Sequence, residues 1–128
     1  MATNYLVGDS LIRIKNAALA RHKTVSVGNS KFVVGVLGAL KRSKIVREFA
    51  VSEDGRTVDV QIAYQKKEPV LLDLKLVSTP GLHLYMDARA LAARKKSTSL
   101  IVTTSKGILT SKEAAKLGVG GEVIVEVS

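Results

Sequence analysis

A run of hydroxyl, cationic and glycine residues, Thr103 to Gly107, directly follows the apolar segment Leu100 to Val102. Hydroxyl groups donate and accept hydrogen bonds without changing their charge, and a lysine attracts phosphate. The residue order excludes a Walker phosphate loop, because Lys106 precedes its glycine instead of following one. A serine or threonine nucleophile would need a base, and none lies nearby in the sequence. We therefore expect a contact surface and not a reaction centre.

The remaining ionisable residues offer little for catalysis or metal binding. His22 lies between two cationic residues, Arg21 and Lys23, a poor setting for a general base, and His83 alternates with leucines as a surface or interface residue would. The sequence has no cysteine and no His, Asp or Glu spacing typical of a metal or glycosidase site. We expect no catalytic residue, metal or cofactor. One alternative of another class stays open, a small enzyme that uses the Thr-Ser-Lys-Gly loop to bind a phosphorylated or nucleotide substrate.

The charge of the chain favours a polyanionic partner. The 128 residues include 20 Lys and Arg but only 11 Asp and Glu, which gives a net charge of +9. A strongly basic chain commonly binds a polyanion. The excess is +5 in residues 1–64 (ten basic, five acidic) and +4 in residues 65–128 (ten basic, six acidic), so no tail carries it. A generally basic, soluble protein is the alternative. No apolar run is long enough for a membrane span, and the N-terminus does not resemble a secretory signal, so we expect no membrane partner.

Aromatic residues and glycines narrow the mode of nucleic-acid binding. Aromatic residues make up 4% of the chain, too few for the stacking platform of an RRM or an OB-fold. Tyr85 follows a Pro-Gly turn and could stack on one unpaired base, although a core or rim position fits its spacing equally well. Gly120 and Gly121 permit a close backbone approach, either to a neighbouring strand or to a ligand, and Gly118 is expected to end a helix.

The hydrophobic pattern predicts an α+β fold in two lobes, 1–66 and 67–128. In the first lobe we expect a helix over 9–20, a strand over 24–27, a helix capped by Ser30 and packed closely through its glycines, and a hairpin formed by 45–51 and 57–64. In the mostly β second lobe we expect strands over 70–76, 82–85, 100–103 and 121–127, a helix from Asp87, and a short helix over 111–117 behind the cap residues Thr110 to Lys112. Val123, Val125 and Val127 are expected on one side of the last strand.

Three segments carry a resemblance to a known family: DSLIRIKNA (9–17), STPGLHLY (78–85) and TTSKGILTSKEAAKLGVGGEVIVEV (103–127). In order and approximate spacing, the chain resembles the small-ribosomal-subunit protein S8 family over nearly its whole length. The resemblance implies a two-lobe protein of the cytoplasmic ribosome that binds a central-domain helix of small-subunit ribosomal RNA (rRNA) during assembly and lies beside other small-subunit proteins. Many members also bind their own operon mRNA, so an extraribosomal translational repressor is a further alternative.

The resemblance also assigns roles to individual residues. In the family the hydroxyl loop enters the minor groove of a distorted RNA helix and contacts an unpaired base. This role falls on Thr103, Thr104, Ser105, Lys106 and Gly107. Tyr85 would pack against the same RNA, and Glu122, after Gly120 and Gly121, would accept hydrogen bonds from a base or sugar. RNA backbone contacts would come from Arg13, Asn16, Ser30 and Lys31. The segment 86–99 departs from the family pattern and adds Arg94, Lys95 and Lys96 as expected basic contacts.

Overall fold

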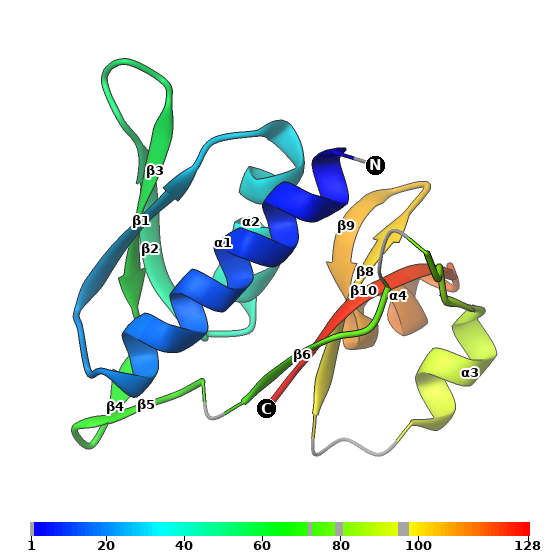
Figure 1. Cartoon of the computed structure of the whole chain (residues 1–128). Coiled ribbons are helices and arrows are strands. Elements are labelled where there is room, and N and C mark those ends of the chain that lie inside the picture. The colour runs from blue at the N-terminus through cyan, green and yellow to red at the C-terminus, as the bar shows by residue number, and fades with distance from the viewer. Residues whose placement is uncertain (1, 72, 79–80, 95–97) are drawn as a thin grey trace.

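The computed structural model describes residues 2–71, 73–78, 81–94 and 98–128, with side chains described from Val7 onward. Its helices and antiparallel sheets confirm the predicted α+β class (Figure 1). In chain order the elements are α1 (Ala2–Leu19), β1 (Thr24–Gly28), α2 (Lys31–Arg42), β2 (Val46–Val51), β3 (Thr57–Ile62), β4 (Tyr64–Gln65), β5 (Glu68–Pro69), β6 (Leu74–Leu76), β7 (Tyr85–Met86), α3 (Ala88–Ala93), β8 (Ser99–Thr104), β9 (Gly107–Thr110), α4 (Ser111–Leu117) and β10 (Gly121–Val127).

The first lobe packs α1 and α2 against an antiparallel sheet of strand order β1-β3-β2. The predicted hairpin is confirmed, since β2 pairs with β3 and the buried side of β3 carries Val58 and Val60. The side chain of Ser30 accepts a hydrogen bond from the backbone N–H of Val33 (3.0 Å), so α2 begins where its cap predicts. The first helix starts earlier than predicted, at Ala2, and Val7 is buried on the same stripe as Leu11.

The second lobe is built on a sheet of strand order β6-β10-β8-β9, with β7 also paired to β10. The prediction for the last strand is wrong in one respect, because a β-bulge interrupts the pairing of β10 with β8. Val123 pairs with Val102 and Val125 with Ile101, so Ile124 is the additional residue. The extra residue reverses the alternation of side chains. Val123 therefore packs in one hydrophobic cluster and Val125 in another.

Two other predicted strands are shorter than expected. Of the segment 70–76, only residues 74–76 form a strand, and Leu72 lies outside the described residues. Of the segment 82–85, only Tyr85 belongs to the two-residue strand β7. The hydroxyl of Ser78 takes part in the pairing just before it, by accepting from the N–H of Leu84 (3.1 Å) and donating to the carbonyl of Val123. A side chain thus replaces part of a strand ladder, which no periodicity predicts.

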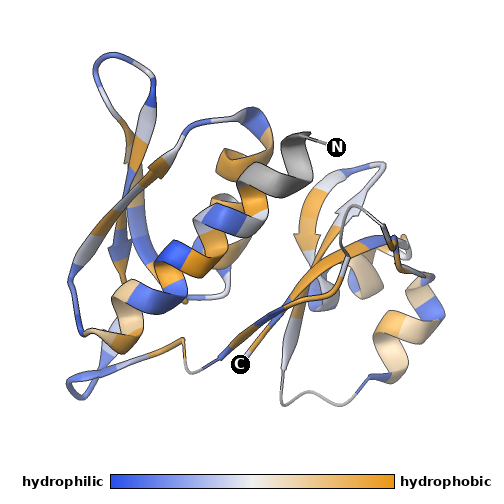
Figure 2. Cartoon of the chain, in the orientation of Figure 1, coloured by the Kyte–Doolittle hydropathy of each residue, from blue (hydrophilic) through white to orange (hydrophobic). Residues whose placement is uncertain are grey.

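The main hydrophobic cluster draws on residues from both sides of position 66. It includes Leu11 and Leu37 of the first lobe together with Ile101 and Val125 of the second. Figure 2 shows hydrophobic residues along α1, β8 and β10, and hydrophilic residues at the β2–β3 and β4–β5 turns. A Cβ atom on Gly35 of α2 would lie 2.6 Å from Cδ1 of Ile108 on β9, which confirms the close packing that this glycine predicts. The boundary between two lobes at residue 66 stays a prediction.

Candidate nucleic-acid interface

Four strands bring the predicted contact residues of the second lobe to one end of its sheet. Tyr85 pairs with Glu122, and Glu122 pairs on its other side with Thr103. In the next row Gly121 pairs with Thr104, which pairs with Gly107. Three segments that are far apart in the sequence therefore meet at one place. We call Tyr85, Thr103–Gly107 and Gly120–Glu122 the sheet-end cluster.

The hydroxyl loop is a tight turn between β8 and β9. Thr104 Oγ1 donates to the carbonyl of Gly107 (2.8 Å) and accepts from the backbone N–H of Lys106 (3.1 Å). Gly107 has a φ of 108°, a conformation that favours glycine. Ser105 and Lys106 are exposed at the tip. The Thr104 hydroxyl thus shapes the turn, and the tip presents one hydroxyl and one ammonium group to an incoming ligand.

Gly120 and Gly121 hold the strands of the cluster close together. A Cβ atom on Gly120 would lie 2.5 Å from the carbonyl oxygen of Met86, and one on Gly121 would overlap the carbonyl oxygen of Thr103. Of the two alternatives for these glycines, close approach to a neighbouring strand is therefore the one that the structure has. Gly118 ends α4 in the left-handed conformation, with a φ of 71°, as predicted.

Tyr85 and Glu122 occupy neighbouring positions but differ in exposure. Tyr85 is 70% exposed, which excludes the alternative of a core tyrosine. The side chain of Glu122 is only 15% exposed, and Nδ1–H of His83 donates to its Oε2 (2.9 Å). Nδ1 must carry the proton, because a carboxylate can only accept. Sequence reasoning placed His83 on a surface or at an interface and missed this contact, for which alternation along one strand gives no signal.

A capped helix lies directly behind the turn. The side chain of Thr110 accepts from the N–H of Glu113 (3.1 Å), and Glu113 Oε1 accepts from the N–H of Thr110 (2.9 Å), which confirms the predicted cap. Glu113 Oε2 also accepts from Nε of Arg42 on α2 (2.8 Å). Partial burial raises the pKa of Glu113, but the hydrogen bonds from Thr110 and Arg42 outweigh it and hold the pKa below its usual value. The cap thus ties the second lobe to the first.

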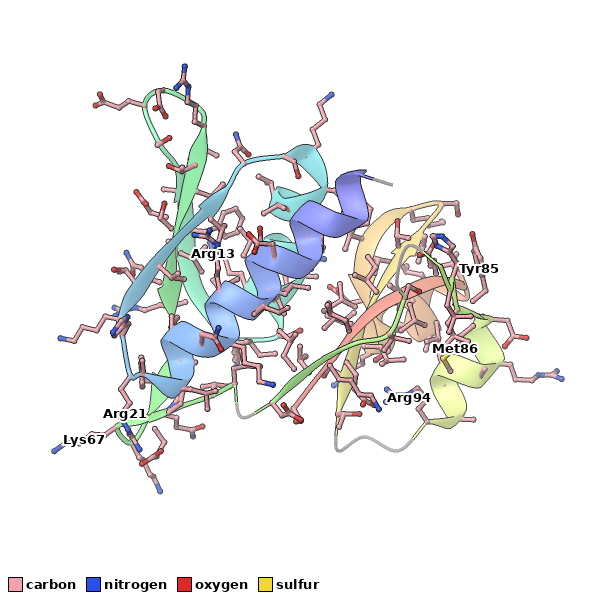
Figure 3. The ribbon with its side chains drawn as sticks, viewed as in Figure 1. Arg13, Arg21, Lys67, Tyr85, Met86 and Arg94 are labelled. Carbon is pink, nitrogen blue, oxygen red and sulfur yellow. The ribbon has the colours of Figure 1, made fainter. Side chains whose placement is uncertain are left out.

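The predicted contact residues of the first lobe lie on α1 and at the start of α2, and Arg13 lies far from the sheet-end cluster (Figure 3). Arg13 and Asn16 are exposed on α1, and Nε of Arg13 donates to Asp9 (3.1 Å). Lys31 is exposed at the first position of α2, next to the cap residue Ser30. Figure 3 shows Arg13 on the first lobe and Tyr85 on the far side of the second. A ligand that touched both Arg13 and Tyr85 would have to extend across the two lobes (Figure 3).

The expected basic contacts near residue 95 are in part engaged within the protein. The Arg94 side chain is 19% exposed, and its guanidinium pairs with Glu126 (3.0 Å) and with the hydroxyl of Thr98 (2.7 Å). Arg94 therefore links the end of α3 to β10 and is not free to meet a ligand. Lys95 and Lys96 lie outside the described residues.

Comparisons with known proteins identify the family of the chain. The family model described as Ribosomal protein S8 matches residues 6–128. The chain belongs to this family. Three proteins named small ribosomal subunit protein uS8 are similar to it: that of Thermosynechococcus vestitus, 39% identical over 99% of both chains; that of Chloroflexus aggregans, 36% identical over 99% of both; and that of Dictyoglomus thermophilum, 39% identical over 94% of this chain and 95% of its own.

Membership in the S8 family confirms the resemblance read from the sequence. Ribosomal protein S8 is not a family of enzymes, which removes the support for a phosphate-binding enzyme. In the part of the chain that the structure describes, no helix is long and apolar enough to cross a membrane. The same described residues contain no group of three or more His, Asp or Glu side chains that could hold a metal ion.

Proposed function

We propose that this chain is a structural constituent of the small ribosomal subunit that binds a central-domain helix of small-subunit rRNA through the sheet-end cluster and supports subunit assembly. The names of its relatives support a place in the small subunit. The observation that carries RNA binding is the strand register, which puts Tyr85, Glu122 and the Thr103–Gly107 turn side by side. Its partners are then rRNA and neighbouring small-subunit proteins, on cytoplasmic ribosomes.

The chemistry of the cluster suits a shaped RNA with an unpaired base. Exposed Tyr85 offers a ring for stacking, and Ser105 offers a hydroxyl to 2′-hydroxyl groups or base edges in a minor groove. Lys106 attracts a phosphate next to that hydroxyl. The remaining oxygen of Glu122, Oε1, can accept from a base or sugar while Oε2 is held by His83. None of these contacts requires a covalent bond to form or break.

The scaffold fixes these groups before the RNA arrives. Thr104 closes the turn, Gly120 and Gly121 allow the strands to approach, and His83 holds Glu122. A preformed surface loses less conformational entropy on binding and recognises shape more selectively. The exposed cations of the first lobe, Arg13 and Lys31 with the polar neighbours Asn16 and Ser30, would add backbone contacts that raise affinity without selecting a sequence. An operon mRNA of similar shape would use the same cluster.

The experiment is a binding titration with the central-domain helix and with a scrambled duplex of equal length. Ser105→Ala should weaken binding of the cognate helix by on the order of 1–3 kcal/mol, because it leaves a polar RNA group unpaired, and should leave the scrambled duplex nearly unaffected. Lys31→Ala is the matched control. It should weaken both RNAs alike and flatten the salt dependence by about one unit. Equal losses for Ser105→Ala on both RNAs would remove the assigned specificity.

A further inference from the structure

A second basic surface lies on the first lobe and includes none of the contact residues assigned so far. It is a hollow of about 1180 Å³, lined by the segment that follows α1, the end of α2, residues of β1 to β4 and the β4–β5 turn. No acidic residue is among the described residues that line it. Six cationic residues do line it, and we call this hollow the basic groove: Arg21, Lys23, Lys41, Lys44, Arg47 and Lys67.

Most of this positive charge is uncompensated. Arg21 pairs with Glu68 (3.2 Å), and Lys41 pairs with Glu48 (2.8 Å), so two of the six cations have an acidic neighbour. Among the described residues the other four form no ion pair with an acidic side chain, although all of them are exposed: Lys23, Lys44, Arg47 and Lys67. Like charges around one concave surface repel each other and raise its potential, and an anion that enters relieves both effects.

Three of these cations have a backbone conformation that glycine or asparagine adopts more easily. The φ angles are 60° at Arg21, 66° at Lys44 and 68° at Lys67. Arg21 and Lys44 follow the ends of α1 and α2 at positions where a helix commonly has glycine, and Lys67 lies in the turn between β4 and β5. Favourable interaction with helix dipoles explains a cation at the first two positions but not at the third. Lys66, next to Lys67 in the same turn, has a φ of 53° and does not line the groove, so the conformation of this turn does not by itself indicate a ligand.

The groove suits a nucleic-acid strand better than a protein partner. Protein interfaces depend on apolar or aromatic anchors that enter exposed pockets. Two apolar side chains of this groove are recessed, since Val46 and Ile62 are only 1% and 4% exposed. The others, Ala63, Tyr64 and Val70, are half-buried. Lysine and arginine side chains spaced around a hollow instead match the repeated charges of a phosphodiester backbone.

We propose that the basic groove binds the phosphodiester backbone of a second RNA segment, separate from the helix at the sheet-end cluster. We call this segment the second because the proposed function assigns a first RNA segment, the central-domain helix, to the sheet-end cluster; this part of the inference rests on that proposed function. Figure 3 places Arg21 and Lys67 at one end of the view and Tyr85 at the other. The chain is then a bivalent RNA binder that holds two segments of one folded RNA in a fixed relation.

The test saturates the full chain with the unlabelled central-domain helix and then titrates a labelled, unstructured ten-nucleotide RNA. A groove variant removes three unpaired cations: Lys23→Gln, Lys44→Gln and Arg47→Gln. A control variant with the same change in net charge removes three exposed cations outside the groove: Arg56→Gln, Lys75→Gln and Lys112→Gln. At about 0.7 per phosphate, the groove variant should reduce the slope of log affinity against log salt by about two units, and the control should leave it nearly unchanged.

Several results would overturn the proposal. These are equal losses in the groove and control variants, displacement of the helix by the oligonucleotide, and tighter binding of polyglutamate of equal charge. A helix that shows no specificity would refute the proposed function alone, because the oligonucleotide titration on the free chain still tests the groove. Lys44→Gly gives a second test. Glycine adopts the positive φ of this position more easily, so the variant should keep or raise the melting temperature while it weakens binding of the oligonucleotide. If Lys44 were purely structural, binding of the oligonucleotide would stay unchanged.

Discussion

Replacing Thr104 by valine tests whether its hydroxyl builds the turn that presents Ser105 and Lys106. Valine keeps the shape and the strand preference of threonine but removes both hydrogen bonds, to the Gly107 carbonyl at 2.8 Å and from the Lys106 N–H at 3.1 Å. Both bonds lie at an exposed turn, so each is at the weak end of the usual range, and together they stabilise the turn by about 1 kcal/mol. The Lys106 amide should then exchange with solvent roughly fivefold faster, since 1.4 kcal/mol corresponds to a factor of ten.

The assays are amide exchange by NMR and titration with the central-domain helix. Thr104→Val should accelerate exchange at Lys106 and weaken the RNA complex by up to roughly fivefold, because binding must restore the ~1 kcal/mol of turn stability that the variant loses. Thr104→Ser keeps the hydroxyl and should behave like the parent chain in both assays. Weakened binding with unchanged exchange at Lys106 would refute this reasoning, because the hydroxyl would then act on the RNA directly. Equal effects of the serine and valine variants would refute it as well.

Two further predictions concern packing and pH. Gly121→Ala places a methyl group on the Thr103 carbonyl, where only backbone could move, and should destabilise the fold by at least about 3 kcal/mol in urea titrations. Gly81→Ala, where a Cβ atom would meet no described atom within 4 Å beyond its chain neighbours, should change the free energy of unfolding by less than about 0.5 kcal/mol. Similar values for the two variants would contradict the close approach at Gly121. The folded-state pKa of Glu113 is lowered, so its contribution to stability is present above its unfolded pKa and is lost as the pH falls. Glu113→Gln should therefore flatten the acid decline between about pH 5 and pH 3, and an unchanged decline would count against the cap.

Local features of this fold were predictable because their causes lie within a few residues. The cap at Ser30, the capping box that begins at Thr110 and the left-handed end of α4 at Gly118 each depend on one short motif. The hairpin of β2 and β3 likewise follows from an Asp-Gly turn between alternating segments. These elements form where the sequence places them, with boundaries shifted by a few residues.

Non-local features were not predictable from this sequence alone. The bulge at Ile124 depends on how β8 and β10 align, and a one-residue shift moves Val125 to the other face without any change in the pattern of valines. The contact between His83 and Glu122 likewise needs the pairing of β7 with β10. The basic groove needs three separate stretches of the chain to meet, within 21–24, 41–47 and 61–70, and its cations are scattered through the sequence.

Sequence motifs also could not separate contact residues from residues that position them. Thr103, Thr104 and Ser105 are one chemical class in the sequence, yet the structure uses the Thr104 hydroxyl inside the turn and leaves Ser105 exposed. Likewise the sequence predicts Arg94 to be a basic contact beside Lys95, but the structure pairs its guanidinium with Glu126. The distinction depends on which partner lies within hydrogen-bond distance, and spacing along a chain does not give this distance.

The position of β10 sets the order in which this protein can become functional as it is synthesised. The strand lies between β8 on one side and β6 and β7 on the other, yet it follows all three in the chain. Before residues 121–127 leave the ribosome, β6 and β7 have no strand to pair with, and β8 has only β9. The row from Tyr85 to Thr103 therefore assembles last, and a nascent chain cannot present it early. Translation must pass β10 before the protein can recognise RNA through this surface.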